Sequence, residues 1–182
     1  LVGCGNYEKV DGIRTDSPAG DVDSHNLVCS WCASARVKIK SADSSSAYLQ
    51  GKEVDRIILY RVPQGGIPEE GVPEGQIIAA RVPIYGTKDA GRGFWLKLRE
   101  VLIENGYAIN FILPTFFTLR TAEGRIVGVC STNVDDLLYG HVVEYEVVMK
   151  KVLDKFKVRE ENVAPFRFCG KEIIQDEDFN IY

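Results

Sequence analysis

The sequence predicts an α+β fold in which an antiparallel sheet carries helices on one face. Residues 36–43 alternate polar and apolar side chains, which is typical of a strand, and residues 94–102 place apolar side chains at helical spacing. Residues 126–140 form two apolar arms around a polar tip, which predicts a hairpin of two short strands. A further helix and strand follow. Leaving out an insertion at 52–88, the order is strand, helix, two strands, helix and strand, the βαββαβ pattern.

Composition places the chain among ordinary globular proteins. Its 182 residues, 45% hydrophobic and 26% charged, suffice for one domain with a core. No apolar run is long enough to span a bilayer and no signal-peptide pattern is present, so no membrane partner is expected. The net charge of −4 argues mildly against a chain that binds nucleic acid unaided. Because Leu1 is not an initiator Met and the last residues resemble a strand, we expect a piece of a longer polypeptide.

The cysteines indicate a reducing compartment rather than a disulfide framework, because their number is odd and most lie among apolar residues. Cys29 and Cys32 have the CxxC spacing of zinc ligands, with His25 upstream, but the sequence holds no second pair. We therefore interpret them as part of a buried helix face, with Asp23 or Ser24 as the N-cap. The apolar face of this helix would carry Leu27, Val28, Trp31 and Cys32. The five cysteines are Cys4, Cys29, Cys32, Cys130 and Cys169.

The segment after the first strand is expected to hold short elements. Residues 47–51 predict one helical turn closed by a Gly. Within the insertion, residues 57–62 and 77–82 predict two short strands. Residues 64–75 contain four Gly and two Pro, so we expect an exposed loop there.

The second half is expected to continue with strands and one long helix. The helix that starts near residue 94 should end at 105–106, and strands at 116–120 and 125–132 should flank a turn at 122–124. Residues 141–157 predict a helix with apolar side chains at helical spacing. The buried stripe of this helix would be Tyr145, Met149, Val152, Leu153 and Phe156.

Two features remain, the lysines of the helix expected at 141–157 and a last strand. We interpret the lysines as a solvated helix side, with contact to phosphate as the alternative. Residues 166–174 predict one strand with Gly170 in its middle, where a Gly often marks a bulge or the close approach of another backbone. The lysines concerned are Lys150, Lys151, Lys155 and Lys157.

Two adjacent acids at the tip of the hairpin are the strongest candidates for chemistry. Asp135 and Asp136 repel each other, and a divalent cation such as Mg²⁺ would remove the repulsion because it prefers carboxylate oxygens. A solvated turn is the alternative, since Asp is a good turn residue. In the βαββαβ order the first strand neighbours the hairpin, so Asp43 should lie beside both acids. Three converging carboxylates would suit a two-metal phosphoryl-transfer site.

Four segments carry a resemblance to a known family. Residues 41–51 contain an Asp followed by Ala-Tyr-Leu-Gln-Gly, and residues 85–95 read Tyr-Gly-Thr-Lys-Asp-Ala-Gly-Arg-Gly-Phe-Trp. Residues 133–139 read Asn-Val-Asp-Asp-Leu-Leu-Tyr, and residues 168–173 read Phe-Cys-Gly-Lys-Glu-Ile. In this order the segments resemble motifs of the reverse transcriptase of copia-type retrotransposon Pol polyproteins. The resemblance covers nearly the whole chain.

This resemblance implies a reverse transcriptase palm with a ferredoxin-like βαββαβ core and partial fingers. The palm would comprise residues 36–51 and 89–182, and the partial fingers residues 1–35 and 52–88, as one domain of a larger polyprotein. Implied partners are an RNA or DNA template with its primer, dNTPs, and the thumb, ribonuclease H and integrase domains that serve reverse transcription and DNA integration. The implied location is intracellular, in a cytoplasmic virus-like particle or in the nucleus.

The resemblance also implies an RNA-directed DNA polymerase, a nucleotidyltransferase that joins a dNTP to a primer 3′-hydroxyl. The catalytic and metal-binding residues would be Asp43, Asp135 and Asp136, holding two Mg²⁺ ions or, alternatively, Mn²⁺. Tyr48 would lie under the incoming sugar and exclude a 2′-hydroxyl, whereas the residues alone favour a core aromatic. The implied nucleotide-binding residues are Tyr48, Asp89, Gly91 and Arg92. The implied primer grip consists of Phe168, Cys169, Gly170 and Lys171.

Three positions depart from the family pattern. Asn133 stands where the family has Tyr, Asp89 where it has Gln, and Gly91 where it has Pro. These departures motivate an alternative function, a degenerate and non-catalytic palm remnant that binds nucleic acid or protein. Another palm-type enzyme, such as a nucleotide cyclase, is a third candidate, but residues 168–173 do not suit it.

Overall fold

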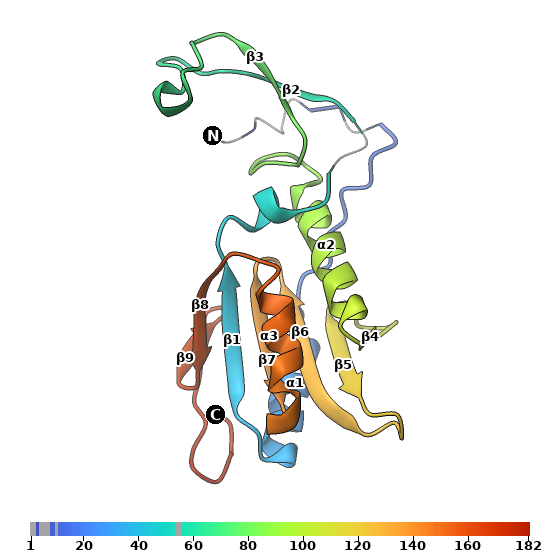
Figure 1. Cartoon of the computed structure of the whole chain (residues 1–182). Helices are drawn as coiled ribbons and strands as arrows, with labels where there is room; N and C mark the ends of the chain where they lie inside the picture. Colours follow the sequence, from blue (N-terminus) through green and yellow to red (C-terminus); the bar gives the residue numbers. More distant parts are fainter. Residues whose placement is uncertain (1–2, 4–7, 10, 54–55) are drawn as a thin grey trace.

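The protein folds around a six-stranded antiparallel sheet, which a computed structural model describes for residues 3, 8–9, 11–53 and 56–182. The strand order is β4-β5-β6-β7-β1-β8 (Figure 1). The α+β class and the antiparallel sheet predicted from the sequence are therefore confirmed. The strands are β1 (Ile39–Ser44), β4 (Tyr107–Ile109), β5 (Phe116–Arg120), β6 (Ile126–Asn133), β7 (Asp136–His141) and β8 (Val158–Val163).

Three helices and two small hairpins surround this sheet. The helices are α1 (Val22–Ala35), α2 (Ala90–Glu104) and α3 (Glu146–Leu153), with short 3₁₀ turns η2 (Ala47–Gln50), η3 (Pro68–Glu70) and η4 (Val143–Tyr145). The hairpins pair β2 (Ile58–Arg61) with β3 (Ile77–Ala80), and β9 (Phe166–Phe168) with β10 (Lys171–Ile173). Figure 1 shows the β2–β3 hairpin beyond the first turn of α2, away from the main sheet.

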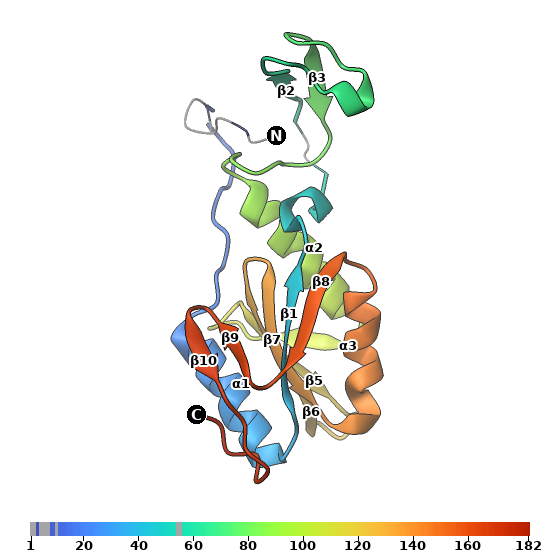
Figure 2. The same cartoon turned by 90° about the vertical axis from the view of Figure 1, so that its left-hand side faces the viewer.

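Two apolar clusters cover the two faces of the sheet, because successive side chains of a strand point to opposite faces. In β7, Leu137 and Tyr139 pack in the cluster that contains α2 and α3. Leu138 between them packs in the other cluster, with α1 and the β9–β10 hairpin. Figure 2 shows α1 and α3 on opposite sides of the sheet. The two helices expected in the βαββαβ pattern share one face, and α1 covers the other.

Helix α1 begins two or three residues earlier than the sequence suggested. The side chain of Asp21 is the N-cap and accepts a hydrogen bond from the Ser24 amide at 2.7 Å, so the prediction of Asp23 or Ser24 as the cap was wrong. The buried helix face is confirmed for Val28 and Cys32, whereas Leu27 is 43% exposed. Within the described residues the cysteines are free thiols, and Cys4 lies outside the described residues.

The elements with strong periodicity match their predictions. Strand β5, helix α2, the η2 turn, the hairpin of β6 and β7, and the β2–β3 pair all lie within a few residues of the expected ranges. Strands β4 and β8 were missed. The three residues of β4 are too few to show alternation. Strand β8 reads Val-Arg-Glu-Glu-Asn-Val, which is polar because the strand is an exposed sheet edge.

Two predictions for the C-terminal third are wrong in detail. The helix expected at 141–157 is shorter, because His141 ends β7, where it is buried and hydrogen-bonds Tyr107. The single strand expected at 166–174 is a hairpin. Cys169 and Gly170 have φ of 48° and 78°, and two consecutive residues in the left-handed region make a tight hairpin turn. Gly170 therefore reverses the chain rather than forming a bulge.

Candidate active site

The two-Asp hairpin and the end of β1 meet at one edge of the sheet. Asn133 and Asp136 are the last paired residues before the turn, so Val134 and Asp135 form the tip. Asp43 in β1 pairs directly with Asp136 in β7, which places their side chains on the same face. The Ser44 amide also donates a hydrogen bond to the Asp135 carbonyl at 3.0 Å. The structure thus brings the backbones of all three predicted acids together.

The electrostatics of this edge are unfavourable for a third negative charge. Burial, together with the charges of Asp135 and Asp43, raises the pKa of Asp136 to about 6. Arg159 in β8 offsets part of this charge, with its Nη1 3.6 Å from Oδ2 of Asp43. The three acids are half-buried and their oxygens are hard donors, so their chemistry suits Mg²⁺.

The three carboxylates at this edge are not arranged as a ready-made set of metal ligands within the described residues. In the part of the chain that the structure describes, no three His, Cys, Asp or Glu side chains lie close enough together to hold a metal ion. Binding of two metal ions by Asp43, Asp135 and Asp136 therefore stays a prediction. What the geometry provides is two strands that present neighbouring carboxylates on one face, together with the acid at the hairpin tip.

Tyr48 lies between this edge and helix α2. Its ring contacts the ring of Tyr85, with centroids 4.6 Å apart, and it is half-buried beside the main apolar cluster. Burial raises the pKa of Tyr48, and the nearby charge of Asp135 contributes in the same direction. A Cβ atom added at Gly91 would lie 3.9 Å from the Tyr48 hydroxyl. The predicted nucleotide-binding residues Tyr48 and Gly91 are therefore neighbours, on the side of Asp135.

Asp89 is held by a cation that the sequence did not suggest. Its buried carboxylate accepts hydrogen bonds from Arg56, at 3.2 Å from Nε and 2.9 Å from Nη2. Glu8 pairs with the same guanidinium. Burial lowers the pKa of Arg56, but the bonds to Asp89 and Glu8 outweigh it, so the net shift is upward. The carboxylate of Asp89 is engaged inside the protein even though this residue precedes α2, where it could have capped the helix.

Arg92 is held by the segment that precedes α1. Its Nη1 donates to the Asp16 carbonyl at 3.1 Å and to Oδ2 of Asp16 at 2.9 Å. Arg14 binds the same carboxylate, and the bond to Arg14 is the main cause of the lowered pKa of Asp16. A cavity of about 400 Å³ opens here. Residues lining it include Lys52, Arg56, Pro83, Asp89, Arg92 and Leu96.

The predicted primer grip forms the turn of the β9–β10 hairpin. Phe168 is buried and contacts the ring of His25 in α1 edge to face, with centroids 5.0 Å apart. Cys169 is exposed, and Asn133 Nδ2 lies 3.0 Å from its sulfur. The structure therefore brings this turn to the tip of the two-Asp hairpin. The role of Asn133 in that contact was not foreseen, because 36 residues separate it from Cys169.

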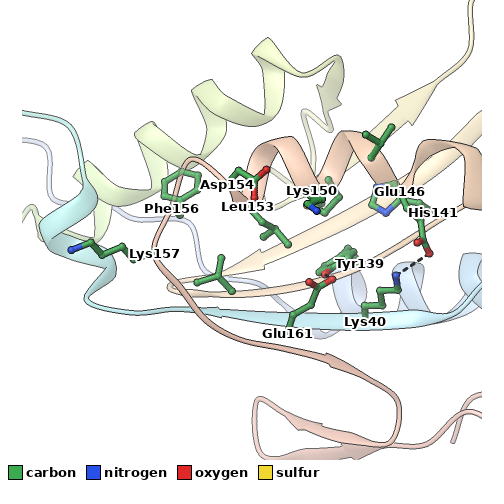
Figure 3. A pocket seen from close by; sticks show the side chains of 13 residues that line it. Lys40, Tyr139, His141, Glu146, Lys150, Leu153, Asp154, Phe156, Lys157 and Glu161 are labelled. Atoms are coloured by element: carbon green, nitrogen blue, oxygen red, sulfur yellow. Dashed lines mark hydrogen bonds and ion pairs between the residues drawn. The ribbon is translucent and has the colours of Figure 1, made fainter.

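A larger cavity, of about 720 Å³, lies away from the acids (Figure 3). It opens between α3 and the strands β1, β7 and β8, and Lys40 and Tyr139 line it. These two side chains are three positions from Asp43 and Asp136, so they point to the opposite face of the sheet. Burial and the charge of Lys40 lower the pKa of His141 to about 4, which keeps that ring neutral at pH 7. This cavity is separate from the carboxylate edge.

Comparison with known proteins points to one family. The family model described as "Reverse transcriptase (RNA-dependent DNA polymerase)" matches residues 3–181. The chain is 27% identical over 155 residues to the "Retrovirus-related Pol polyprotein from transposon RE2" of Arabidopsis thaliana, across 83% of this chain and 10% of that polyprotein. It is 26% identical over 129 residues to the corresponding polyprotein from transposon RE1, across 71% and 8%. The chain thus spans about a tenth of the length of these relatives. No solved structure matches significantly.

Proposed function

This chain belongs to the reverse transcriptase (RNA-dependent DNA polymerase) family, and we propose that it forms the palm and partial fingers of a retrotransposon polymerase. The resemblance to copia-type elements is confirmed. The order β1, α2, β6, β7, α3, β8, with strands β6-β7-β1-β8 adjacent in the sheet, supports a ferredoxin-like palm core. The palm would comprise residues 36–51 and 89–182, and the fingers residues 1–35 and 52–88.

The proposed reaction is transfer of a deoxynucleotide to a primer 3′-hydroxyl, with pyrophosphate leaving. Asp43, Asp135 and Asp136 would hold two Mg²⁺ ions, which when bound supply charge stabilisation for the attacking and leaving oxygens. The remaining work of the protein is positioning. Tyr48 would lie under the sugar and exclude a 2′-hydroxyl, and Gly91 leaves room beside the Tyr48 hydroxyl. The turn at residues 168–171 would hold the primer end.

One observation carries this proposal. Asp43 and Asp136 are paired across two strands on one face, with Asp135 at the adjoining tip, although the first two are 93 positions apart along the chain. Negative charges placed so close raise the pKa of Asp136 and favour a bound cation over a plain solvated turn. The proposed partners are a primer with an RNA or DNA template, dNTPs, and other domains of the polyprotein.

Primer extension on an RNA template tests the proposal, with the chain joined to the polyprotein segments that flank it. Asp135→Asn removes one ligand charge while keeping the size of the side chain, so we expect extension to fall about a hundredfold or more. Asp178→Asn is the matched control, because Asp178 is exposed in the C-terminal loop. Equal extension by the parent and Asp135→Asn would contradict a catalytic role. No extension by the parent would point to a non-catalytic remnant.

A further inference from the structure

The position of the β9–β10 hairpin relative to the two-Asp tip is set by side chains. This hairpin is a separate two-stranded sheet and shares no ladder with the six-stranded sheet. Its inward residues Phe166, Phe168 and Ile173 enter the apolar cluster that contains α1. Apolar burial is favourable but non-directional. It therefore holds the hairpin against the α1 cluster but does not by itself prevent the hairpin from sliding along that surface. Hydrogen bonds that join Ala164 and Gln175 to Ile39 and Val37 tie the open end of the hairpin to the β1 segment, so a directional contact at the turn would fix its other end against the tip.

One side-chain hydrogen bond supplies that direction. Asn133 Nδ2 donates to Cys169 Sγ at 3.0 Å, and among the described residues no other side-chain hydrogen bond joins the two hairpins. Asn133 is the last residue of β6 and is paired with Asp136, so its backbone is fixed by the ladder. Cys169 is the first turn residue, with φ of 48°, so the turn fixes the direction of its Cα–Cβ bond. Both ends of the bond therefore stand on defined backbone.

The space around Asn133 also limits where its side chain can go. A Cβ atom added at Gly20 would lie 3.2 Å from Asn133 Cβ, 2.9 Å from the Thr132 carbonyl and 2.5 Å from His25 Nε2. The segment before α1 therefore closes off one side of Asn133. The ring of His25 in turn rests against Phe168, next to Cys169. The segment before α1, helix α1, the end of β6 and the β9–β10 turn meet here, and the side-chain amide of Asn133 points to the Cys169 thiol.

We propose that Asn133 and Cys169 form a latch that positions the β9–β10 turn against the tip carrying Asp135 and Asp136. The inference rests on the proposed function, in which that turn holds the primer end. Asn133 is a positioning residue here: it touches the turn, and through the turn it sets where the primer 3′-hydroxyl lies relative to the carboxylates. The bond that forms the latch needs both Asn133 and Cys169.

A thiol cross-link tests the geometry without polymerase activity. In Asn133→Cys, the two thiols lie on the same side of the contact, so a short bifunctional thiol reagent should join positions 133 and 169, as identified by mass spectrometry of the linked peptides. Asn133→Cys combined with Cys169→Ser is the matched control and should give no such peptide. A thermal melt of each reduced variant checks that it folds. Failure of the folded Asn133→Cys protein to cross-link would overturn the latch.

Kinetics and hydrogen exchange test the positioning role. Asn133→Ala removes the donor, so we expect the KM for primer–template to rise about fivefold, as for loss of one net hydrogen bond, with a smaller change in kcat. Cys169→Ala should behave alike, and Cys169→Ser, which keeps an acceptor, should recover most of the affinity. The amides of residues 168–171 should exchange faster in Asn133→Ala. Unchanged exchange would overturn the latch even if no variant extends a primer, whereas absence of extension by the parent itself counts against the proposed function.

Discussion

Asp136 and Asp89 are both carboxylates withdrawn from solvent, and their neighbours give them different properties. Asp89 accepts two hydrogen bonds from Arg56, so its charge is matched inside the protein. Asp136 faces Asp135 and Asp43 instead, and burial together with those charges raises its pKa to about 6. A residue type alone could not distinguish the two, because the partners come from distant parts of the chain. Only Asp136 is left with a charge that a cation would stabilise.

The pH dependence of stability should reveal the strain on Asp136. Its folded pKa of about 6 lies above the unfolded value of 3.8, so folding is favoured below pH 3.8 and loses this contribution as the pH rises to about 6. Because the group is half-buried, we expect a loss of about 1–2 kcal/mol. Asp136→Asn should therefore melt at a higher temperature than the parent at pH 7 in EDTA, and the difference should shrink toward pH 4.

Asp178→Asn serves as the control for this comparison, because the control acid is exposed and lies in the C-terminal loop. It should melt like the parent at both pH values. If Asp136→Asn lowered the melting temperature at pH 7, the repulsion between the carboxylates would not be the dominant influence at that edge.

At the scale of elements, the β6–β7 hairpin holds a strained residue at its tip. Val134 has φ of 55°, a left-handed conformation that is unfavourable for a β-branched side chain by about 1–2 kcal/mol. The pairs Asn133 with Asp136 and Asp43 with Asp136 hold this turn from both sides. Strain of this kind persists where the surrounding ladder over-determines the backbone, and here it fixes the direction of the next residue, Asp135.

Val134→Gly should separate stability from activity. Gly adopts the left-handed conformation without a clash, so the melting temperature should rise slightly, by the equivalent of up to about 1 kcal/mol. The freed tip would hold Asp135 less firmly, so primer extension should fall severalfold. Val163→Gly is a matched control, because Val163 lies in β8 without positive φ and the same change there should only destabilise. A drop in melting temperature for Val134→Gly would show that the turn is not strained.

The elements also show how far sequence reasoning reaches. Strand β5 and helix α2 were predictable, because their apolar residues repeat at the spacing of the structure they adopt. The hairpin and the neighbourhood of Asp43 and Asp136 followed from element order. Strand β8 could not be predicted, since its side chains reflect an exposed edge rather than burial. The bond from Arg56 to Asp89 depends on tertiary packing and leaves no local signal in the sequence.

At the scale of the whole molecule, the cations that line the cavity beside Asp89 and Arg92 are matched by acids. Lys52 forms an ion pair with Glu100. Arg56 pairs with both Glu8 and Asp89, and Arg92 pairs with Asp16. The chain as a whole carries a net charge of −4. Affinity for nucleic acid comes largely from unpaired Lys and Arg that neutralise phosphates. The isolated chain therefore offers little electrostatic attraction to a primer–template duplex.

We expect this 182-residue chain alone to bind an RNA–DNA primer–template weakly, with a Kd that rises further as salt increases from about 50 to 200 mM. Fluorescence anisotropy of a labelled duplex measures the affinity at each salt concentration. Joining the flanking polyprotein segments should tighten binding at every concentration. Tight, salt-insensitive binding by the isolated chain would contradict this expectation and would point to contacts other than those to phosphate.

Strand β8 ends the main sheet, and among the described residues no strand lies beside its outer edge. An unpaired strand edge invites the strand of another molecule, which is how sheets grow into aggregates. Here the edge carries Arg159, Glu160 and Glu161 in succession, mostly exposed. A second copy that paired in parallel and in register would bring like charges together, and any pairing would have to strip water from them. The same charged row that made this strand hard to predict thus limits the sheet to six strands and favours a molecule that stays dispersed.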